Sequence, residues 1–360
     1  MFYFIAHYFT SNFPILNVLK YITFRSICAM LFAFLLTMII CPRFINYLKF
    51  GGRTQPIRED GPETHLKKSG TPTMGGVVIV LVSLLSTLFW SNFLNIYVIL
   101  LWIIAISYAI LGFIDDYLKI SKKNSRGVSY KTKLVWQLGI AAAVALIAVM
   151  VDSSKIATSI TVPFFKDYFI NLSWFYLVFA AIVIVGSSNA VNLTDGLDGL
   201  ATGPLIIILG YFALIAYIVG NTNFANYLQI THIPGTGEMV IVCAAMIGAS
   251  LGFLWYNAPP AKIFMGDVGS LSLGGAVGAM SVFTKHEFAL FFAGGLFVIE
   301  ALSVILQVAS FKIYKKRIFK MAPIHHHFEK MGWSESTVVI RFWIIALMFG
   351  LLGLAMLKLR

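Results

Sequence analysis

The chain has 360 residues, of which 59% are hydrophobic and only 12% are charged, and its mean hydropathy is +0.85. A soluble domain carries about 25% charged residues, so this composition excludes an ordinary soluble protein and indicates a polytopic membrane protein. The formal net charge of +12 is explained by basic loops that stay in the cytoplasm, so we expect no nucleic-acid partner.

Apolar stretches of spanning length recur along the whole chain and predict an all-α membrane protein. Each spanning helix needs roughly 20 residues, and no soluble segment of domain size separates them, so we expect a single integral membrane domain over residues 1–360. Residues 1–20 lack the basic start and cleavage site of a signal peptide and are expected at the membrane interface. The ten predicted helices cover residues 23–44, 75–94, 96–117, 134–151, 172–190, 200–219, 239–256, 263–283, 289–310 and 338–357.

The basic residues predict the orientation of these helices. The loops 46–73, 118–133, 257–262 and 311–337 together hold 18 Lys and Arg residues, whereas the loops on the opposite side hold three. Because basic loops stay in the cytoplasm, we expect these four loops there. An even number of helices then places both termini outside. The three cysteines have no metal-binding spacing, and we expect no disulfide.

The third predicted helix ends in two adjacent acids, Asp115 and Asp116, in the sequence "LGFIDDYLKI". A carboxylate pair is unfavourable at a helix C-terminus because of the helix dipole, which argues against a merely solvated helix end. Two such groups can bind a divalent cation. Lys119 follows one turn after Asp115 and suits either an acid or a phosphate as partner.

The loop "NLTDGLDGL" between the fifth and sixth predicted helices offers Asn192, Asp195 and Asp198. Acids three residues apart share a face if the segment is helical. Gly196 and Gly199 permit close backbone approach to a ligand. The alternative is a capped start of the next helix, with Thr194 or Asp195 as the cap.

Three further motifs lie on the predicted cytoplasmic side. Asp267 in "FMGDVGS" stands alone at the head of a membrane helix, which favours metal or substrate binding, and Phe264 precedes it. The run His325, His326 and His327 does not resemble a zinc site but suits phosphate contact. The segment "KKSGTPTMGG" offers lysines, threonines and glycines to a phosphate without forming a Walker motif.

Within the ninth predicted helix, Glu300, Ser303 and Gln307 share one face, where they either join helices or line a substrate cleft. Acids for Mg²⁺ and cations for phosphate are the components of phosphoryl transfer. The membrane body suggests that one substrate is a lipid. A cation-coupled transporter is the alternative, but its acids should lie near the middle of the membrane.

The motifs "GTPTMGG", "GFIDDY", "NAVNLTDGLDGL", "FMGDVGSL" and "APIHHHFE" resemble those of the bacterial phospho-N-acetylmuramoyl-pentapeptide transferases, over residues 20–360. These enzymes belong to the polyprenyl-phosphate N-acetylhexosamine-1-phosphate transferase superfamily. A relative within the superfamily that transfers GlcNAc-1-phosphate is the alternative, although the histidine triplet is similar to the muramoyl branch.

The resemblance implies a Mg²⁺-dependent enzyme of the bacterial cytoplasmic membrane, commonly a homodimer, with its active site facing the cytoplasm. UDP-MurNAc-pentapeptide and undecaprenyl phosphate would give lipid I and UMP. It implies that Asp267 is the Mg²⁺ ligand and that Asp115 and Asp116 handle the lipid phosphate and the metal. The substrate-binding residues that it implies are Lys68, Thr73, Lys119, Lys131, Asn192, Asp195, Asp198, Asn257, Phe264, Gln307, His325, His326 and His327.

Overall fold

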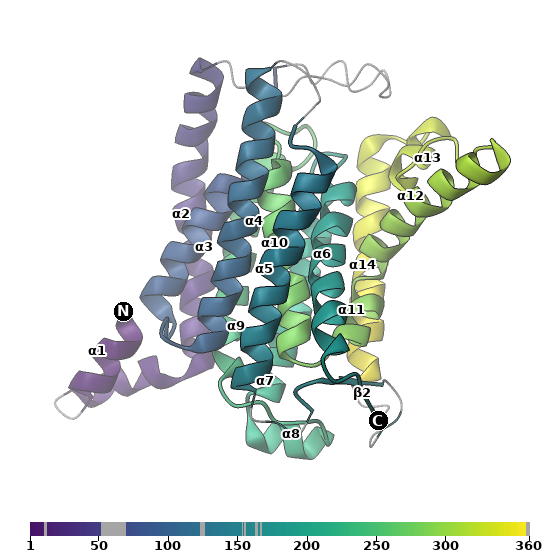
Figure 1. Ribbon diagram of the computed structural model, residues 1–360. Coiled ribbons are helices and arrows are strands. Elements are labelled where there is room, and N and C mark those ends of the chain that lie inside the picture. The colour runs from purple at the N-terminus through teal and green to yellow at the C-terminus, as the bar shows by residue number, and fades with distance from the viewer. Residues whose placement is uncertain are drawn as a thin grey trace.

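A computed structural model describes residues 1–10, 13–51, 70–122, 127–152, 154, 156–162, 165 and 168–357 and shows a bundle of long helices (Figure 1). All ten predicted apolar segments contain a helix, so the all-α prediction is confirmed. Within the described ranges, eight helices are long and apolar enough to cross a membrane, and Gly76–Trp90 is a shorter apolar helix. The helices are α1 (Phe2–Phe9), α2 (Ile22–Phe50), α3 (Gly76–Trp90), α4 (Ile96–Ser121), α5 (Tyr130–Val151), α6 (Phe175–Thr194), α7 (Thr202–Val219), α8 (Thr222–Leu228), α9 (Met239–Asn257), α10 (Gly266–Phe283), α11 (Glu287–Ala293), α12 (Gly295–Tyr314), α13 (Ile324–Lys330) and α14 (Glu335–Met356).

Shorter elements connect these helices. The 3₁₀ helices η1 (Pro14–Lys20) and η3 (Thr236–Glu238) precede α2 and α9. Strands β1 (Ser159–Thr161) and β2 (Phe169–Asn171) pair antiparallel, with Ile160 opposite Ile170.

Helix α10 lies in the centre of the bundle, and every residue from Val268 to Phe283 is buried. Its glycines and serines replace the large side chains of an ordinary spanning helix because neighbouring backbones pack directly against it. A Cβ on Gly76 of α3 would overlap the backbone of Gly269, and a Cβ on Gly112 of α4 would overlap the backbone of Asp267. These close approaches fix the start of α10 against α3 and α4.

The segment predicted as one helix over residues 289–310 is two helices, which corrects that prediction. Helix α11 ends at Ala293, and α12 begins at Gly295. Two adjacent glycines, Gly294 and Gly295, favour a break because glycine is a poor helix former. A Cβ on Gly295 would also overlap the ring of Phe349 in α14. Beyond the break, α12 leans away from the bundle (Figure 1).

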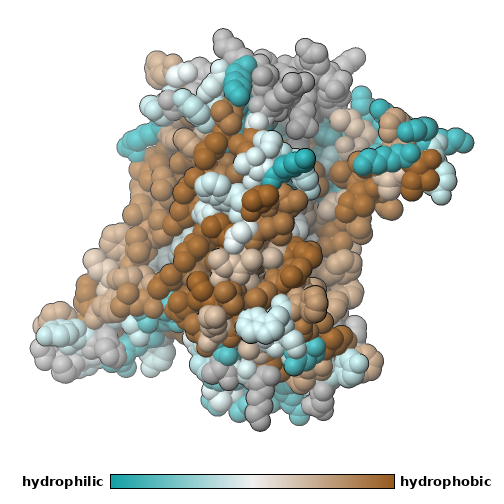
Figure 2. All heavy atoms as spheres, in the orientation of Figure 1, coloured by the Kyte–Doolittle hydropathy of each residue, from teal (hydrophilic) through white to brown (hydrophobic). Residues whose placement is uncertain are grey.

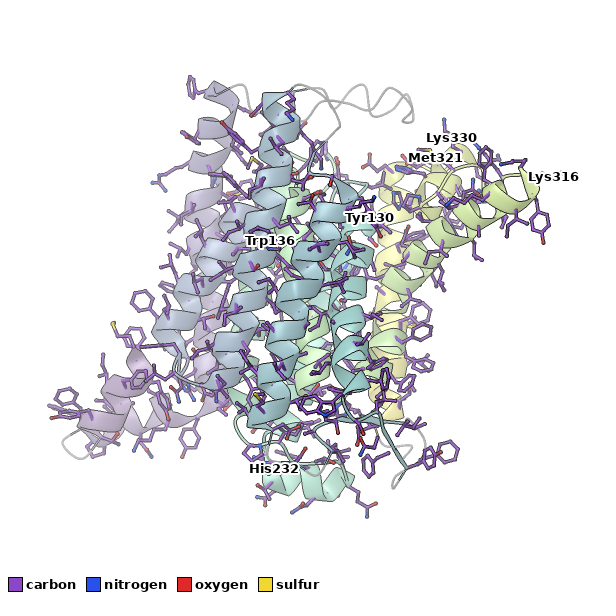
Figure 3. All side chains as sticks on the ribbon, viewed as in Figure 1. Tyr130, Trp136, His232, Lys316, Met321 and Lys330 are labelled. Atoms are coloured by element: carbon purple, nitrogen blue, oxygen red, sulfur yellow. The ribbon has the colours of Figure 1, made fainter. Side chains whose placement is uncertain are left out.

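The two ends of the bundle differ in composition. Tyr130, Lys316, Met321 and Lys330 lie at the upper end in Figure 3, whereas His232 lies at the lower end. Helix α1 and the last turn of α14 both lie at the lower end in Figure 1. Figure 2 shows a hydrophobic belt between two more hydrophilic ends, as a membrane-spanning body requires.

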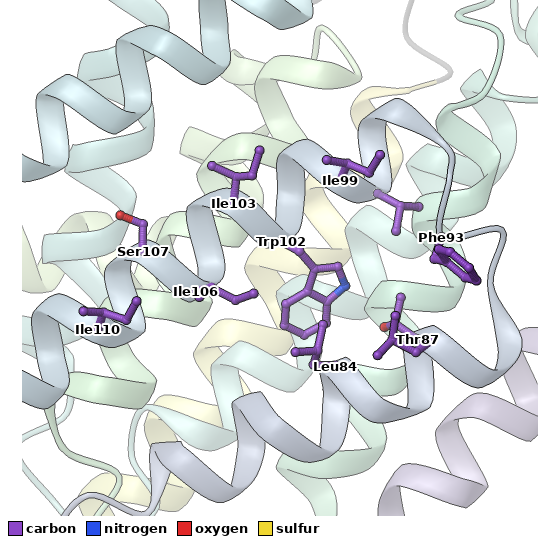
Figure 4. Close-up of a pocket in the computed structure, with 11 residues that line it drawn as sticks. Leu84, Thr87, Phe93, Ile99, Trp102, Ile103, Ile106, Ser107 and Ile110 are labelled. Atoms are coloured by element: carbon purple, nitrogen blue, oxygen red, sulfur yellow. The ribbon is translucent and has the colours of Figure 1, made fainter. Parts of the chain in front are cut away.

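Two apolar grooves run along the sides of the bundle. One, of about 430 Å³, lies between α3 and α4 and is lined by residues such as Leu84, Trp102 and Ile106 (Figure 4). The other, of about 500 Å³, lies between α6, α11 and α12. No residue proposed for chemistry from the sequence lines either groove.

Candidate active site

Asp115, Asp116 and Asp267 converge at the upper end of the bundle, and we call them the acidic triad. One carboxylate oxygen from each of the three residues lies within 4.8 Å of the other two. Asp115 and Asp116 come from the last turns of α4 and are buried, and Asp267 comes from the first turn of α10. The triad therefore depends on the packing of α4 against the start of α10.

Two lysines, Lys119 and Lys133, bridge the triad, and we call them the lysine pair. The Lys119 Nζ lies 2.6 Å from Asp115 Oδ2 and 3.2 Å from Asp267 Oδ2. The Lys133 Nζ lies 3.0 Å from Asp115 Oδ1 and 2.8 Å from Asp267 Oδ2, the oxygen that Lys119 also contacts. Three carboxylates would repel one another in a buried site, and the two ammonium groups offset most of that repulsion.

Backbone groups also hold Asp115 in place. The N–H of Val128 donates to Asp115 Oδ1 at 2.6 Å. A Cβ on Gly127 would overlap the Asp115 carboxylate, so glycine is needed for this close approach. The residues before α5 thus approach the triad together with Lys133, which lies in the first turns of α5.

Asn192, on the last turn of α6, orients Asp267. Its Nδ2 donates to Asp267 Oδ1 at 2.9 Å and to the Ser270 hydroxyl at 2.9 Å. The amide therefore fixes one oxygen of Asp267, while the lysine pair contacts the other. The sequence prediction that Asn192 belongs to the site is consistent with this geometry.

Thr73 lies beside the triad because a backbone ladder joins its segment to the start of α10. The N–H of Phe264 donates to the carbonyl of Pro72, and the N–H of Gly75 donates to the carbonyl of Phe264, both at 2.9 Å. Thr73 is buried, and its hydroxyl oxygen has no hydrogen-bond partner among the described residues. A Cβ on Gly266 would lie 3.0 Å from this oxygen and would overlap Asp116 Oδ2.

The α6–α7 loop carries Asp195 and Asp198 in turns rather than in a helix, so the shared helical face that the spacing allowed does not form. Burial and, to a smaller extent, the negative charge of Asp267 raise the pKa of Asp195 to about 7, although the N–H of Gly266 opposes the shift. Asp198 Oδ2 accepts from the N–H of Ala261 at 2.9 Å. The loop begins after Thr194, which ends α6, and α7 starts only at Thr202.

Asn257 is the last residue of α9, and Phe264 lies in the loop that leads from α9 into α10. Asn257 is buried; its Oδ1 accepts from the Thr202 hydroxyl, and its Nδ2 donates to the carbonyl of Ile263, both at 2.9 Å. The Phe264 side chain is half-buried. Asn257 therefore shapes this loop, and its proposed contact with a nucleotide stays a prediction.

The three histidines of α13 have three different environments, as neighbouring residues on a helix should. His325 is fully buried, and its Nδ1 lies 3.0 Å from Glu300 Oε2. His326 Nδ1 lies 2.7 Å from Glu329 Oε2. His327 Nδ1 accepts from the N–H of Lys320 at 3.1 Å.

Glu300 and Gln307 lie on one face of α12, and both contact residues that follow this helix in the sequence. Glu300 holds His325, and Gln307 Oε1 accepts from the N–H groups of Ile318 and Phe319 at 3.1 and 2.9 Å. The His325 Nε2 faces Gly196, where a Cβ would overlap it. This contact joins α13 to the loop that carries Asp195.

Two predicted lysines are not placed among the triad. Lys68 lies outside the described residues, and its role stays a prediction. Lys131 is exposed on the first turn of α5, two residues before Lys133. Sequence reasoning missed Lys133, although its position on the same basic helix start was the available signal.

The donor set of the acidic triad fits a magnesium ion. Mg²⁺ prefers oxygen ligands and is commonly bound by one or two carboxylates together with substrate phosphates. The three converging carboxylates and the unpartnered Thr73 hydroxyl beside Asp116 match that chemistry.

Comparison with known proteins assigns the family. Residues 98–285 match the model of glycosyl transferase family 4, and residues 68–80 match signature 1 of the phospho-N-acetylmuramoyl-pentapeptide-transferases. The phospho-N-acetylmuramoyl-pentapeptide-transferase of Phenylobacterium zucineum is 54% identical over the whole of both chains. Those of Bartonella quintana and Rhodopseudomonas palustris are 54% and 51% identical over 97% and 98% of both chains. The chain therefore belongs to glycosyl transferase family 4 and, within it, to the phospho-N-acetylmuramoyl-pentapeptide-transferases.

Proposed function

We propose that this protein transfers phospho-MurNAc-pentapeptide from UDP-MurNAc-pentapeptide to undecaprenyl phosphate, giving lipid I and UMP for peptidoglycan synthesis. The observation that carries the proposal is the acidic triad with its lysine pair at one end of a membrane-spanning bundle. Anionic substrates need cations at the reacting centre, and a lipid acceptor needs a site at the membrane edge.

The proposed chemistry forms a bond between an oxygen of the lipid phosphate and the sugar-linked phosphorus, while the bond to UMP breaks. Mg²⁺ held by Asp267 with Asp115 and Asp116 would neutralise phosphate charge and polarise the transferring phosphoryl group. The acceptor phosphate is already ionised, so little base catalysis is needed.

The protein's own residues position these groups. Asn192 holds Asp267, and Val128 holds Asp115. The ammonium groups of Lys119 and Lys133 lie where phosphate oxygens would gain charge-assisted hydrogen bonds. Thr73 offers a buried hydroxyl on the α3 side of the triad.

The location of the site follows from the same proposal. We propose the cytoplasmic membrane, with the triad facing the cytoplasm, because described basic residues of the loops, such as Lys316 and Lys330, lie at this end of the bundle (Figure 3). Homodimer formation is proposed from the family resemblance.

The test is a release assay for UMP. Purified protein is incubated with undecaprenyl phosphate, Mg²⁺ and either UDP-MurNAc-pentapeptide or UDP-GlcNAc. We expect UMP only from the muramoyl substrate. Release from UDP-GlcNAc alone would instead assign the chain to GlcNAc-1-phosphate transfer.

A further inference from the structure

The end of α12 and the turn after it present an unusual exposed surface. All eight residues from 311 to 318 are exposed, and we call this segment the arm. Its sequence, FKIYKKRI, combines four large apolar residues with four cations. The exposed fractions of Ile313 and Tyr314 are 69% and 71%. Exposed apolar side chains are common in this membrane-spanning chain, so the feature that distinguishes the arm is the group of cations among them.

The arm is positively charged without compensation from its own part of the sequence. Lys312, Lys315, Lys316 and Arg317 supply four cations, and no Asp or Glu occurs from residue 301 to residue 328. The surface therefore favours an anionic partner that also offers a hydrocarbon environment.

The fold holds the arm in a defined place. Lys315 adopts a left-handed conformation that ends α12. The Ser310 hydroxyl donates to the carbonyl of Lys316 at 2.9 Å, and Gln307 binds the backbone of Ile318 and Phe319. Ser310 and Gln307 are residues of α12, so this helix fixes the backbone of the turn that follows it.

The arm projects sideways from the bundle rather than over the acidic triad. Lys316 lies at its outer tip in Figure 3, to the side of the helices near their upper end. In Figure 2, hydrophilic side chains gather on the outer end of this projection, above a hydrophobic surface that continues down α12. With the hydrophobic belt in the hydrocarbon, the hydrophilic outer end of the arm would lie at the level of the lipid headgroups.

We propose that the arm is an interfacial anchor that inserts its apolar side chains between lipids and binds the phosphates of anionic phospholipids. Each basic residue close to an anionic surface adds to the attraction, and long basic side chains reach from apolar depth to the headgroups. The proposal concerns the surrounding bilayer and does not depend on the transfer reaction.

Lipid selectivity tests the charged half of the proposal. The protein is reconstituted in phosphatidylcholine vesicles with trace spin-labelled phosphatidylglycerol or spin-labelled phosphatidylcholine, and the motionally restricted fractions are compared. The arm variant carries Lys315→Gln, Lys316→Gln and Arg317→Gln. The matched control carries Lys49→Gln, Lys122→Gln and Lys262→Gln, which remove the same charge from exposed positions elsewhere in the basic loops or helix ends.

We expect the wild-type protein and the control to prefer phosphatidylglycerol over phosphatidylcholine. In the arm variant, the ratio of the two restricted fractions should fall at least about threefold. Equal losses in both variants would show general charge attraction and overturn the proposal. Loss of the preference in 5 mM inorganic phosphate at constant ionic strength would assign the arm to a free phosphate instead.

Depth measurement tests the apolar half. A spin label at Tyr314→Cys, in a Cys28→Ser background because Cys41 and Cys243 are buried, should collide more with oxygen than with a water-soluble nickel complex. A label at Lys330→Cys, on exposed α13, should show the reverse. Equal nickel access at both positions would place the arm in water and contradict the anchor.

Discussion

Asp115 and Asp116 are adjacent in sequence but differ in how far their charges are neutralised. Asp115 has the Val128 N–H and both ammonium groups of the lysine pair within 3.0 Å. Among the described residues, Asp116 has the N–H of Val268 at 3.4 Å and the Lys119 Nζ at 3.7 Å as its neutralising partners. Asp116 is therefore the carboxylate with more capacity left for a metal or a phosphate-bound cation.

We predict that Asp115→Asn and Asp116→Asn each lower turnover at least about tenfold, or roughly 1.4 kcal/mol of barrier. Each change removes a charge that the lipid phosphate site needs. Kinetics with the lipid acceptor and calorimetric titration with UDP-MurNAc-pentapeptide separate the two steps. Nucleotide affinity that collapsed while acceptor kinetics stayed normal would show that the lipid-phosphate role is wrong.

Lys133→Gln should also lower turnover at least about tenfold, because Lys133 holds Asp115 and Asp267 together. Steady-state kinetics are compared with those of Lys122→Gln, which removes a charge from the exposed end of α4 and should stay within about twofold of the wild type. Near-normal turnover of the Lys133 variant would remove this residue from the site.

The sequence predicted most of this arrangement but not which lysine of α5 completes it. An acid pair at a helix end and a lone acid at a helix start are visible without a structure. Lys131 and Lys133 lie on different faces of α5. Which face is turned toward the triad depends on how α5 packs against α6 and α4. The Val128 contact likewise depends on the backbone path before α5.

Helix α13 is the element that links the C-terminal part of the chain to the acidic centre. His325 joins Glu300 of α12, and its other ring nitrogen faces Gly196. Gly196 adjoins Asp195, which is close enough to Asp267 for its pKa to rise. A displacement of α13 would therefore also move the loop that carries Gly196 and Asp195.

Gly196→Ala tests this link. Its Cβ would overlap the His325 ring, so we expect the variant to lose about 1–3 kcal/mol of unfolding free energy and to bind the nucleotide substrate more weakly. Gly210→Ala is the control, since a Cβ there meets no atom within 4 Å. Thermal unfolding and the KM for the nucleotide are measured on both. Identical behaviour of the two variants would mean that the contact with His325 is unimportant.

At the level of elements, hydropathy located the helices because burial in lipid requires long apolar runs. It did not locate the break at Gly294, since glycine pairs also occur within packed membrane helices. It also missed the ion pair of Arg25 with Glu238, whose Arg25 Nη2 and Glu238 Oε1 lie 2.6 Å apart. That pair joins residues 213 positions apart and follows only from the packing of α2 beside α9.

In the part of the chain that the structure describes, the acidic triad and basic residues such as Lys316 and Lys330 lie at one end of the bundle (Figure 3). Helix α1 and the last turn of α14 lie toward the other end (Figure 1). The sequence predicted this polarity from its lysines and arginines. The charge rule is the basis of our proposal that the end with the triad faces the cytoplasm.

Topology is tested by two cysteines at opposite ends. Lys122→Cys, at the end of α4, should resist an impermeant thiol reagent added outside intact cells. Asn226→Cys, exposed on α8 at the lower end, should react rapidly. The unsubstituted protein is the control, because any labelling of it comes from the native cysteines. The opposite labelling pattern would reverse the orientation and place the triad outside.

The central claim is that the acidic triad is the catalytic centre, and Asp267→Asn tests it most directly. The change keeps the shape of the side chain and removes the charge that Asn192, Lys119 and Lys133 surround. UMP release from UDP-MurNAc-pentapeptide and undecaprenyl phosphate is measured at saturating Mg²⁺, with helix content and thermal unfolding checked on the same sample. We predict a folded protein without detectable turnover. A folded variant that released UMP at near the wild-type rate would contradict the account.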